Sequence, residues 1–243
     1  MSAPLAMILT AAVGFAGSFV QSASGFGYAI ICMTFWPLLM PFRMASIIEV
    51  ITAFFMVVYL TVRLRKSISV KLLLPPVIIS VIFSFLGVNA LLSLSDEVLR
   101  RILGAALLAL ALYFIFLSDR IRLKGSLITG LAAGTISGFF GGLFNIGGPP
   151  MVAYYLSVTE DKETYDATLQ AYFCCTTISI FLIHMFGGNV TAEMIPYGVS
   201  ALAGTALGTL LGFVVFRRLT LTGIKRFIYV FMTAAGCYLL LFT

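Results

Sequence analysis

The chain has 243 residues, of which 61% are hydrophobic and only 10% charged, and its mean hydropathy is +1.11. A soluble domain of this length carries charge on about a quarter of its residues, so this composition excludes a soluble domain and indicates that most of the exterior faces lipid. The net charge of +6 comes from basic residues between apolar runs, where membrane proteins keep cytoplasmic Lys and Arg, and it predicts no nucleic-acid partner. Residues 1–243 are therefore expected to form a single transmembrane domain.

Ten apolar runs, bounded by charged residues, Gly or Pro, follow one another along the chain. Backbone polar groups in lipid must be hydrogen-bonded within the protein, so these runs are expected to be helices. In chain order the predicted elements are 5–22, 26–40, 42–62, 72–92, 98–117, 125–143, 149–158, 164–186, 193–216 and 223–242. The second and seventh are short, and each follows a Gly-rich break. The sequence thus predicts an all-α polytopic membrane protein.

The two halves of the chain, 5–117 and 125–242, are similar to each other. Small and helix-breaking residues recur in the same order at an offset of 121 residues, and the recurrence includes the matched pair Gly17 and Gly138. Weak internal repeats of this kind are a feature of membrane transporter folds. The single domain is therefore expected to contain two repeats, with a break near the start of each.

The distribution of basic residues predicts how the two repeats are oriented. Lys and Arg concentrate in the connections at 63–71, 118–124 and 217–226, which predicts that these connections are cytoplasmic. Alternation then places the start of the first half outside and the start of the second half inside. The sequence therefore predicts two inverted-topology repeats, each a broken or re-entrant helix pair plus three transmembrane helices.

The two breaks are the candidate binding site. A short helix that begins inside the protein directs free N–H groups and the positive end of its dipole at the break, an arrangement that binds anions. Inverted symmetry would bring the two breaks together near the midplane. The alternative is that the glycines only permit close helix packing. The predicted site residues are Gln21, Ser22, Ser24, Gly25, Phe26, Gly27 and Tyr28 in the first break, and Asn145, Ile146, Gly147, Gly148 and Pro149 in the second.

These breaks also carry a family resemblance. The run from Gly138 through Gly-Gly-Leu-Phe-Asn-Ile-Gly-Gly-Pro-Pro to Val152 resembles the glycine-rich motif of the TauE/SafE family of sulfite exporters. The stretch from Gly14 to Tyr28 is similar to its first-half counterpart, although Ser24 and Phe26 differ from the family's plainer run of glycines. The resemblance covers the whole chain. It implies that the protein is a multi-pass protein of the bacterial inner membrane that transports sulfite, sulfoacetate or a related organosulfonate.

Glu49 is the most prominent ionisable residue within a predicted span. Carboxylates inside membrane helices are costly and often functional, and the repeat places Gln170, an uncharged isostere, at the matching position. We expect either that Glu49 couples transport to protons or that it is a structural carboxylate paired with Arg43 or a hydroxyl. The only histidine, His184, is expected to be a packed or interfacial side chain. No Cys or His spacing indicates a metal or another cofactor.

Three functional classes are compatible with a chain of this kind. The first is a secondary transporter that works by alternating access, with or without coupling to protons, and its partners are a small anion and membrane lipid. The second is an anion channel, or a transporter of another oxyanion such as thiosulfate or a carboxylate. The third, an intramembrane enzyme, is disfavoured because no HExxH motif and no nucleophile with a base occur. The sequence leaves the transport direction open, and also whether the protein is a monomer or a homodimer.

Overall fold

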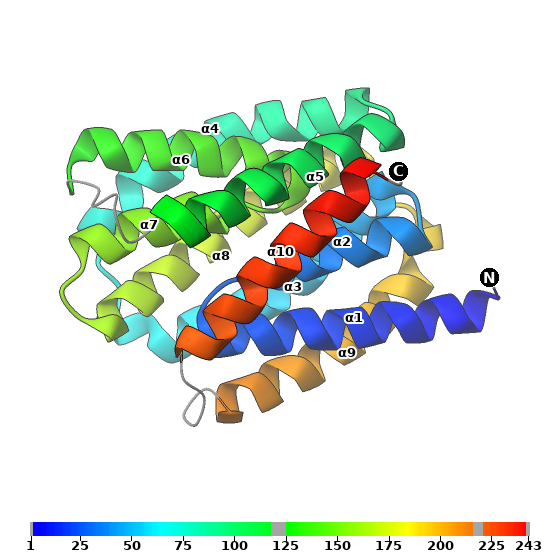
Figure 1. The fold of residues 1–243 in the computed structure, drawn as a ribbon, viewed down its shortest axis with the longest axis horizontal. Helices are drawn as coiled ribbons and strands as arrows, with labels where there is room; N and C mark the ends of the chain where they lie inside the picture. The colour runs from blue at the N-terminus through cyan, green and yellow to red at the C-terminus, as the bar shows by residue number, and fades with distance from the viewer. Residues whose placement is uncertain (1, 118–124, 216–220, 242–243) are drawn as a thin grey trace. The chain divides into compact units, whose positions relative to one another are not determined.

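The computed structural model describes residues 2–117, 125–215 and 221–241 (Figure 1). Over this part of the chain the regular structure is entirely helical, which confirms the all-α prediction. The α-helices are α1 (Ala3–Ser24), α2 (Tyr28–Leu39), α3 (Phe42–Leu64), α4 (Val70–Ser93), α5 (Asp96–Leu112), α6 (Leu127–Phe144), α7 (Gly148–Val158), α8 (Lys162–Phe186), α9 (Ile195–Val215) and α10 (Leu221–Leu241). Three short turns are η1 (Arg65–Ser67), the π-helical η2 (Tyr113–Leu117) and η3 (Ala192–Met194).

The ten α-helices correspond to the ten predicted elements. Wherever an end is described, it lies within two residues of the prediction when the π-helical η2 is counted as the continuation of α5. A long helix, a break, a short helix and three further long helices occur in that order in each half. The connections 118–124 and 216–220, to which part of the charge-based topology refers, lie outside the described residues. The inverted orientation of the two halves therefore stays a prediction.

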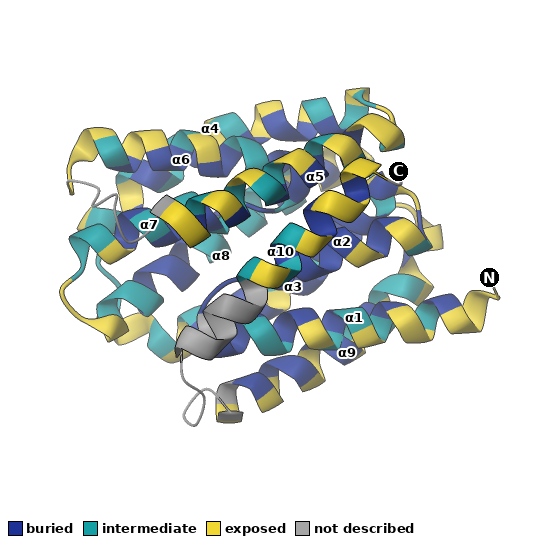
Figure 2. Ribbon diagram, in the orientation of Figure 1, coloured by how far each residue is buried: buried dark blue, intermediate teal, exposed yellow. Residues whose placement is uncertain are grey.

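Seven described helices are long and apolar enough to cross a membrane. Large apolar residues are exposed along several of them, for example Ile78 and Phe85 of α4 and Val199 and Leu207 of α9. Figure 2 colours exposed residues yellow, and yellow segments occur along both of these helices. Helix α3 differs, because 61% of the residues in its most apolar stretch are buried inside the protein. Exposed apolar surface on this scale requires lipid as its solvent. The protein is therefore a multi-pass membrane protein, as its composition predicted.

The chain forms two compact units, and segments of both predicted repeats contribute to each. The first unit comprises Met1–Ser46, Ser93–Arg122 and Pro196–Thr243. The second comprises Ile47–Leu92 and Leu123–Ile195. The first break lies in the first unit and the second break lies in the second.

Helices within the first unit cross closely at small residues. Gly204, Gly208 and Gly212 of α9 lie directly against backbone carbonyl groups of α1, and Gly104 of α5 lies against Gly236 of α10. In Figure 1, α1 lies beside α9, and α5 lies beside α10. Membrane helices associate through such close backbone approach because lipid supplies little hydrophobic driving force.

Close approach through glycine also organises the second unit. On α6, Gly134, Gly138 and Gly142 lie one helical turn apart, and each meets the backbone of α4. On α4, Gly87 meets the backbone of α6 around Phe139. This packing brings α4 against the last turns of α6, immediately before the second break.

Candidate functional site

The first break depends on two glycines with left-handed backbone conformations. Helix α1 ends at Ser24, and the following Gly25 has φ 88° and donates its N–H to the Gln21 carbonyl at 2.7 Å. Gly27 has φ 118° and precedes the first residue of α2. Side chains with a Cβ rarely adopt these angles. The glycines predicted as site residues are therefore needed to reverse the chain and start a new helix within the protein.

Gln21 caps the N-terminus of the new helix. Its side-chain oxygen Oε1 accepts a hydrogen bond from the backbone N–H of Tyr28 at 3.0 Å, and the residue is only 7% exposed. The first N–H groups of a helix have no partner within the helix, and they carry the positive end of its dipole. The Gln21 amide oxygen is a neutral acceptor at the N-terminus of α2. An oxygen of a bound anion could accept the same N–H hydrogen bond at this position.

The other residues of the first break face different neighbours. The Phe26 ring stacks on Phe114 of the π-helical turn, with centroids 6.0 Å apart. The Tyr28 hydroxyl lies 2.8 Å from the hydroxyl of Thr205 on α9. The Ser22 hydroxyl is buried without a hydrogen-bond partner among the described residues. The side chain of Ser24 lies outside the described residues. The Tyr28 hydroxyl is therefore hydrogen-bonded to α9 in this structure.

The second break uses a different device to turn the chain. Helix α6 ends at Phe144, and Asn145, with φ 60°, is the only described non-glycine residue with a positive φ. Its N–H donates to the Gly141 carbonyl at 2.8 Å, and the N–H of Ile146 donates to Phe140 at 3.3 Å. Asn tolerates the left-handed conformation better than most residues. Predicted site residue Asn145 therefore ends α6.

Helix α7 then begins with Gly148 after the N-cap residue Gly147. Pro149, which is buried, stands in the first helical turn, where the missing N–H of proline costs nothing. A methyl group on Gly147 would lie 2.7 Å from the carbonyl oxygen of Ser137. The structure thus shows the close-packing role of Gly147 against α6, and the binding role of Gly147 and Pro149 stays a prediction.

A chain of hydroxyl groups fixes the second break, and sequence reasoning missed it. The Ser137 hydroxyl of α6 donates to the carbonyl of Gly147, and the Tyr172 hydroxyl of α8 donates to Ser137 at 2.7 Å. The same Tyr172 oxygen lies 2.6 Å from the hydroxyl of Ser80, which also bonds the Gly134 carbonyl at 2.7 Å. Side chains from α4, α6 and α8 thus converge on the N-cap of α7. Nothing in the spacing of these residues indicated that they would meet.

Glu49 lies buried in α3 and is 3% exposed. Among the described residues, no hydrogen bond or ion pair involves its carboxylate. Its backbone carbonyl accepts a hydrogen bond at 3.0 Å from the Thr52 hydroxyl, which also bonds the Ile48 carbonyl. The choice between proton coupling and a structural role for Glu49 therefore stays a prediction. Gln170 is 1% exposed, and its amide donates to Asp166 at 3.3 Å. The sequence had not singled out Asp166.

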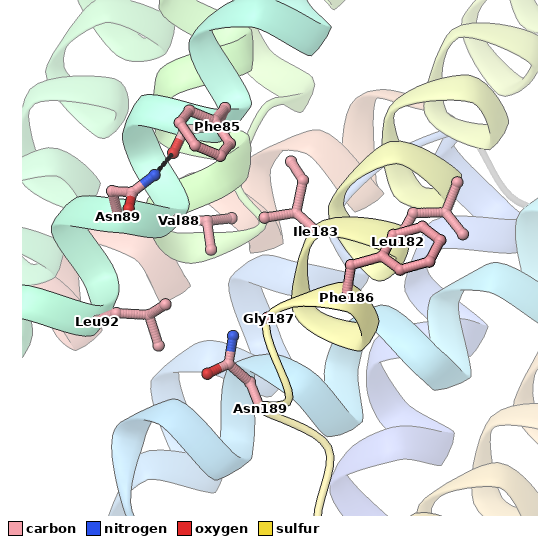
Figure 3. A pocket seen from close by; sticks show the side chains of 9 residues that line it. All are labelled: Phe85, Val88, Asn89, Leu92, Leu182, Ile183, Phe186, Gly187 and Asn189. Carbon is pink, nitrogen blue, oxygen red and sulfur yellow. Dashed lines mark hydrogen bonds between the residues drawn. The ribbon is translucent and has the colours of Figure 1, made fainter.

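A pocket of about 450 Å³ opens between the ends of α4 and α8. Figure 3 shows Val88 of α4 and Ile183 of α8 pointing toward each other between the two helices. Val88 also packs in a buried apolar cluster with Val50 and Ile180. The pocket lining is largely apolar and includes none of the residues predicted from the two breaks: it consists of Phe85, Val88, Asn89, Leu92, Leu182, Ile183, Phe186, Gly187 and Asn189.

His184 lies in the last turn of α8, beside this pocket. The residue is fully buried, and its ring nitrogen Nδ1 lies 3.5 Å from the Asn189 amide. Of the two positions expected for this histidine, packed or interfacial, the structure shows the packed one.

Fold and breaks together define a class of protein. Irregular backbone within a membrane protein occurs where it is buried in protein or lines a cavity, and interrupted helices that present their N-termini are a feature of transporters. Residues 2–117, 125–215 and 221–241 contain two such interruptions between apolar helices, so the chain has the architecture of a multi-pass membrane transport protein.

Comparison with known families identifies the group within this class. Residues 10–239 match the family described as Sulfite exporter TauE/SafE, so the chain belongs to this family of anion transporters. A location in the bacterial inner membrane is consistent with the family. No curated protein matches the chain, and no solved structure matches it.

Proposed function

We propose that the chain is a secondary transporter that moves a small sulfur-containing anion across the bacterial inner membrane by alternating access. The substrate class is sulfite, sulfoacetate or a similar organosulfonate. One observation supports this most strongly: in the first break, a buried helix N-terminus is capped by the neutral amide oxygen of Gln21. A transported oxyanion can displace this weak internal acceptor, whereas a fixed carboxylate at the same position would repel it.

The chemistry of both breaks suits an anion that must bind and then leave. Neither break sequence, 21–28 or 141–150, contains Lys or Arg. The charge of the substrate is therefore balanced by helix dipoles, backbone N–H groups and neutral side chains rather than by a full countercharge. Transport requires binding that is favourable enough for entry and weak enough for release. Each break is proposed to bind the anion at the N-terminus of its short helix.

Glu49 is proposed to couple transport to protons. A carboxylate that is buried without a countercharge is costly to ionise in a low-dielectric environment. A change in its surroundings during the transport cycle would therefore change whether it holds a proton. Moving a proton with an anion also reduces the net charge that crosses the membrane, which lowers the electrostatic cost of the step.

A thermal-unfolding screen of the purified protein tests the substrate class. The protein is titrated with sulfite, sulfoacetate, isethionate, thiosulfate and small carboxylates, with chloride, choline and glucose as controls. We expect Tm to rise with at least one sulfur-containing anion in a saturable manner, because a ligand that binds only the folded state stabilises it. If none of these anions raises Tm and choline or glucose does, the anion-site assignment is wrong.

A further inference from the structure

The Tyr155 side chain has an unusual environment for a tyrosine in the second unit. The residue is fully buried, and its hydroxyl has no hydrogen-bond partner among the described residues. Leaving such a group unpaired carries a desolvation cost, and buried tyrosine hydroxyls usually find a partner. Two other buried tyrosines follow that rule, because Tyr28 pairs with Thr205 and Tyr172 pairs with Ser137 and Ser80.

The position of Tyr155 relates this hydroxyl to the second break. Tyr155 lies in α7 seven residues after Gly148, which is about two turns, so both residues lie on nearly the same face of the helix. Side chains on a helix tilt toward its N-terminus, so the phenol extends from its Cα back in the direction of the break. The Tyr155 ring also contacts the Tyr172 ring, with centroids 6.3 Å apart. Tyr172 is the residue that reaches the N-cap Gly147 through Ser137.

We propose that the Tyr155 hydroxyl is a substrate ligand that donates a hydrogen bond to an oxygen of the transported anion at the N-terminus of α7. This inference rests on the proposed function and adds a specificity-determining residue to it. The ligand class is a small oxyanion, because a phenol O–H in a fixed position selects an anion that presents an oxygen acceptor. The neighbouring Tyr172 is a positioning residue, since its hydroxyl is already engaged in fixing the break.

Three variants separate these roles through their stability without substrate. Tyr155→Phe removes a hydroxyl that has no partner, so the Tm of the substrate-free protein is expected to stay unchanged or to rise. Tyr172→Phe removes a hydroxyl with two partners, so its substrate-free Tm is expected to fall. Ser179→Ala, in α8 like Tyr172, removes a hydroxyl that bonds only the carbonyl of Thr176. It serves as the matched control and is expected to bind substrate like the wild type.

Substrate binding and transport then test the ligand role. With the sulfur-containing anion that raises the wild-type Tm most, Tyr155→Phe is expected to weaken the apparent affinity roughly 10- to 100-fold, the range for losing one hydrogen bond to a charged group. In proteoliposomes, the KM of Tyr155→Phe for that anion is expected to rise with a smaller effect on the maximal rate.

The possible results separate this inference from the function on which it rests. Loss of affinity without loss of substrate-free stability in Tyr155→Phe supports the proposal. A Tyr155→Phe protein that binds like the wild type overturns it and leaves the transporter function standing. So does a drop in substrate-free Tm as large as that of Tyr172→Phe, because the hydroxyl would then have a structural partner. A wild-type protein that responds to no sulfur-containing anion refutes the proposed function itself.

Discussion

Gly212 on α9 offers a direct test of how the first break is held in place. A methyl group on Gly212 would lie 2.5 Å from the carbonyl oxygen of Phe19, 2.9 Å from its Cα and 3.0 Å from the Cβ of Ser22. These atoms belong to the last two turns of α1, directly before the break. The substitution Gly212→Ala therefore pushes against backbone, which cannot rotate away as a flexible side chain could.

The structure sets the size of the expected effect. The new methyl must move about 0.5 Å from Phe19 to reach 3.0 Å, the shortest separation that Cβ atoms show, and about 0.9 Å to reach ordinary contact at 3.4 Å. Overpacking of this kind costs typically about 1–3 kcal/mol. The replacement of Gly by Ala within a helix offsets this by about 1 kcal/mol of helix propensity. The net result is a protein whose free energy of unfolding is unchanged to about 2 kcal/mol lower.

The same helix supplies a matched control. Gly198 also lies in α9, and among the described residues no atom outside its own stretch of helix is within 4 Å of a methyl group placed there. Gly198→Ala should therefore gain helix propensity without a clash, and its stability should rise by up to about 1 kcal/mol. Thermal unfolding of the two purified variants in detergent measures the difference directly. An overpacking cost of about 1–3 kcal/mol corresponds to a gap of roughly 2–12 °C in Tm.

Transport by the two variants adds a functional readout. Displacement of the last turns of α1 moves Ser22 and the residues that follow it, so Gly212→Ala is expected to reduce anion transport while Gly198→Ala keeps it. Equal Tm values for the two variants would refute the reasoning, because the close crossing of α1 and α9 would then not constrain the helices. A Gly212→Ala protein that is destabilised but transports at the wild-type rate would separate the crossing from the function of the break.

Three further predictions concern single side chains. Glu49→Gln is expected to flatten the pH dependence of transport in proteoliposomes. Glu97→Gln changes an exposed carboxylate and should keep the pH profile of the wild type. An unchanged pH profile in Glu49→Gln would exclude proton coupling through this residue. Arg100→Ala loses a charged hydrogen bond of 2.5 Å to the Pro37 carbonyl and should lower the free energy of unfolding by about 1.5–3 kcal/mol. Arg101→Ala loses only an exposed ion pair and should lower it by less than about 1 kcal/mol. Similar Tm values for the two variants would contradict the difference expected between them. Phe114→Ala removes a buried ring that stacks on Phe26 and is expected to cost about 3–5 kcal/mol, so a Tm within 2 °C of the wild type would show that the stack contributes little.

Much of the fold could be predicted because lipid imposes strong constraints on sequence. Each helix that crosses the membrane has to be apolar and long, and a break within the protein requires residues that tolerate unusual backbone angles. Gly25 and Gly27 satisfied that requirement visibly, and the short helices after both breaks followed from it. The π-helical turn at Tyr113–Leu117 could not be predicted in this way. An α-helical and a π-helical turn of the same apolar residues differ only in their backbone hydrogen bonds, so the composition does not distinguish them.

The details of the candidate site depended on contacts between distant segments. Gln21 was recognised as a polar residue in a break, but only the structure shows that its side chain caps the following helix. The hydroxyl chain from Tyr172 through Ser137 to Gly147 joins residues from α8 and α6 and the N-cap of α7. In sequence, Tyr172 stands in an apolar run and resembles any packed aromatic residue. Pairing between helices carries this information, and a single sequence does not contain it.

Counterflow in proteoliposomes tests the central claim most directly. Vesicles that contain the purified protein are loaded with a high concentration of unlabelled sulfite or sulfoacetate and diluted into a trace of the labelled anion. A carrier with a single alternating site exchanges the two, so we expect transient accumulation of label inside the vesicles above its outside concentration. Label that only equilibrates, at a rate indifferent to the internal anion, would contradict alternating access and indicate a channel. No protein-dependent flux of any sulfur-containing anion would contradict the proposed function altogether.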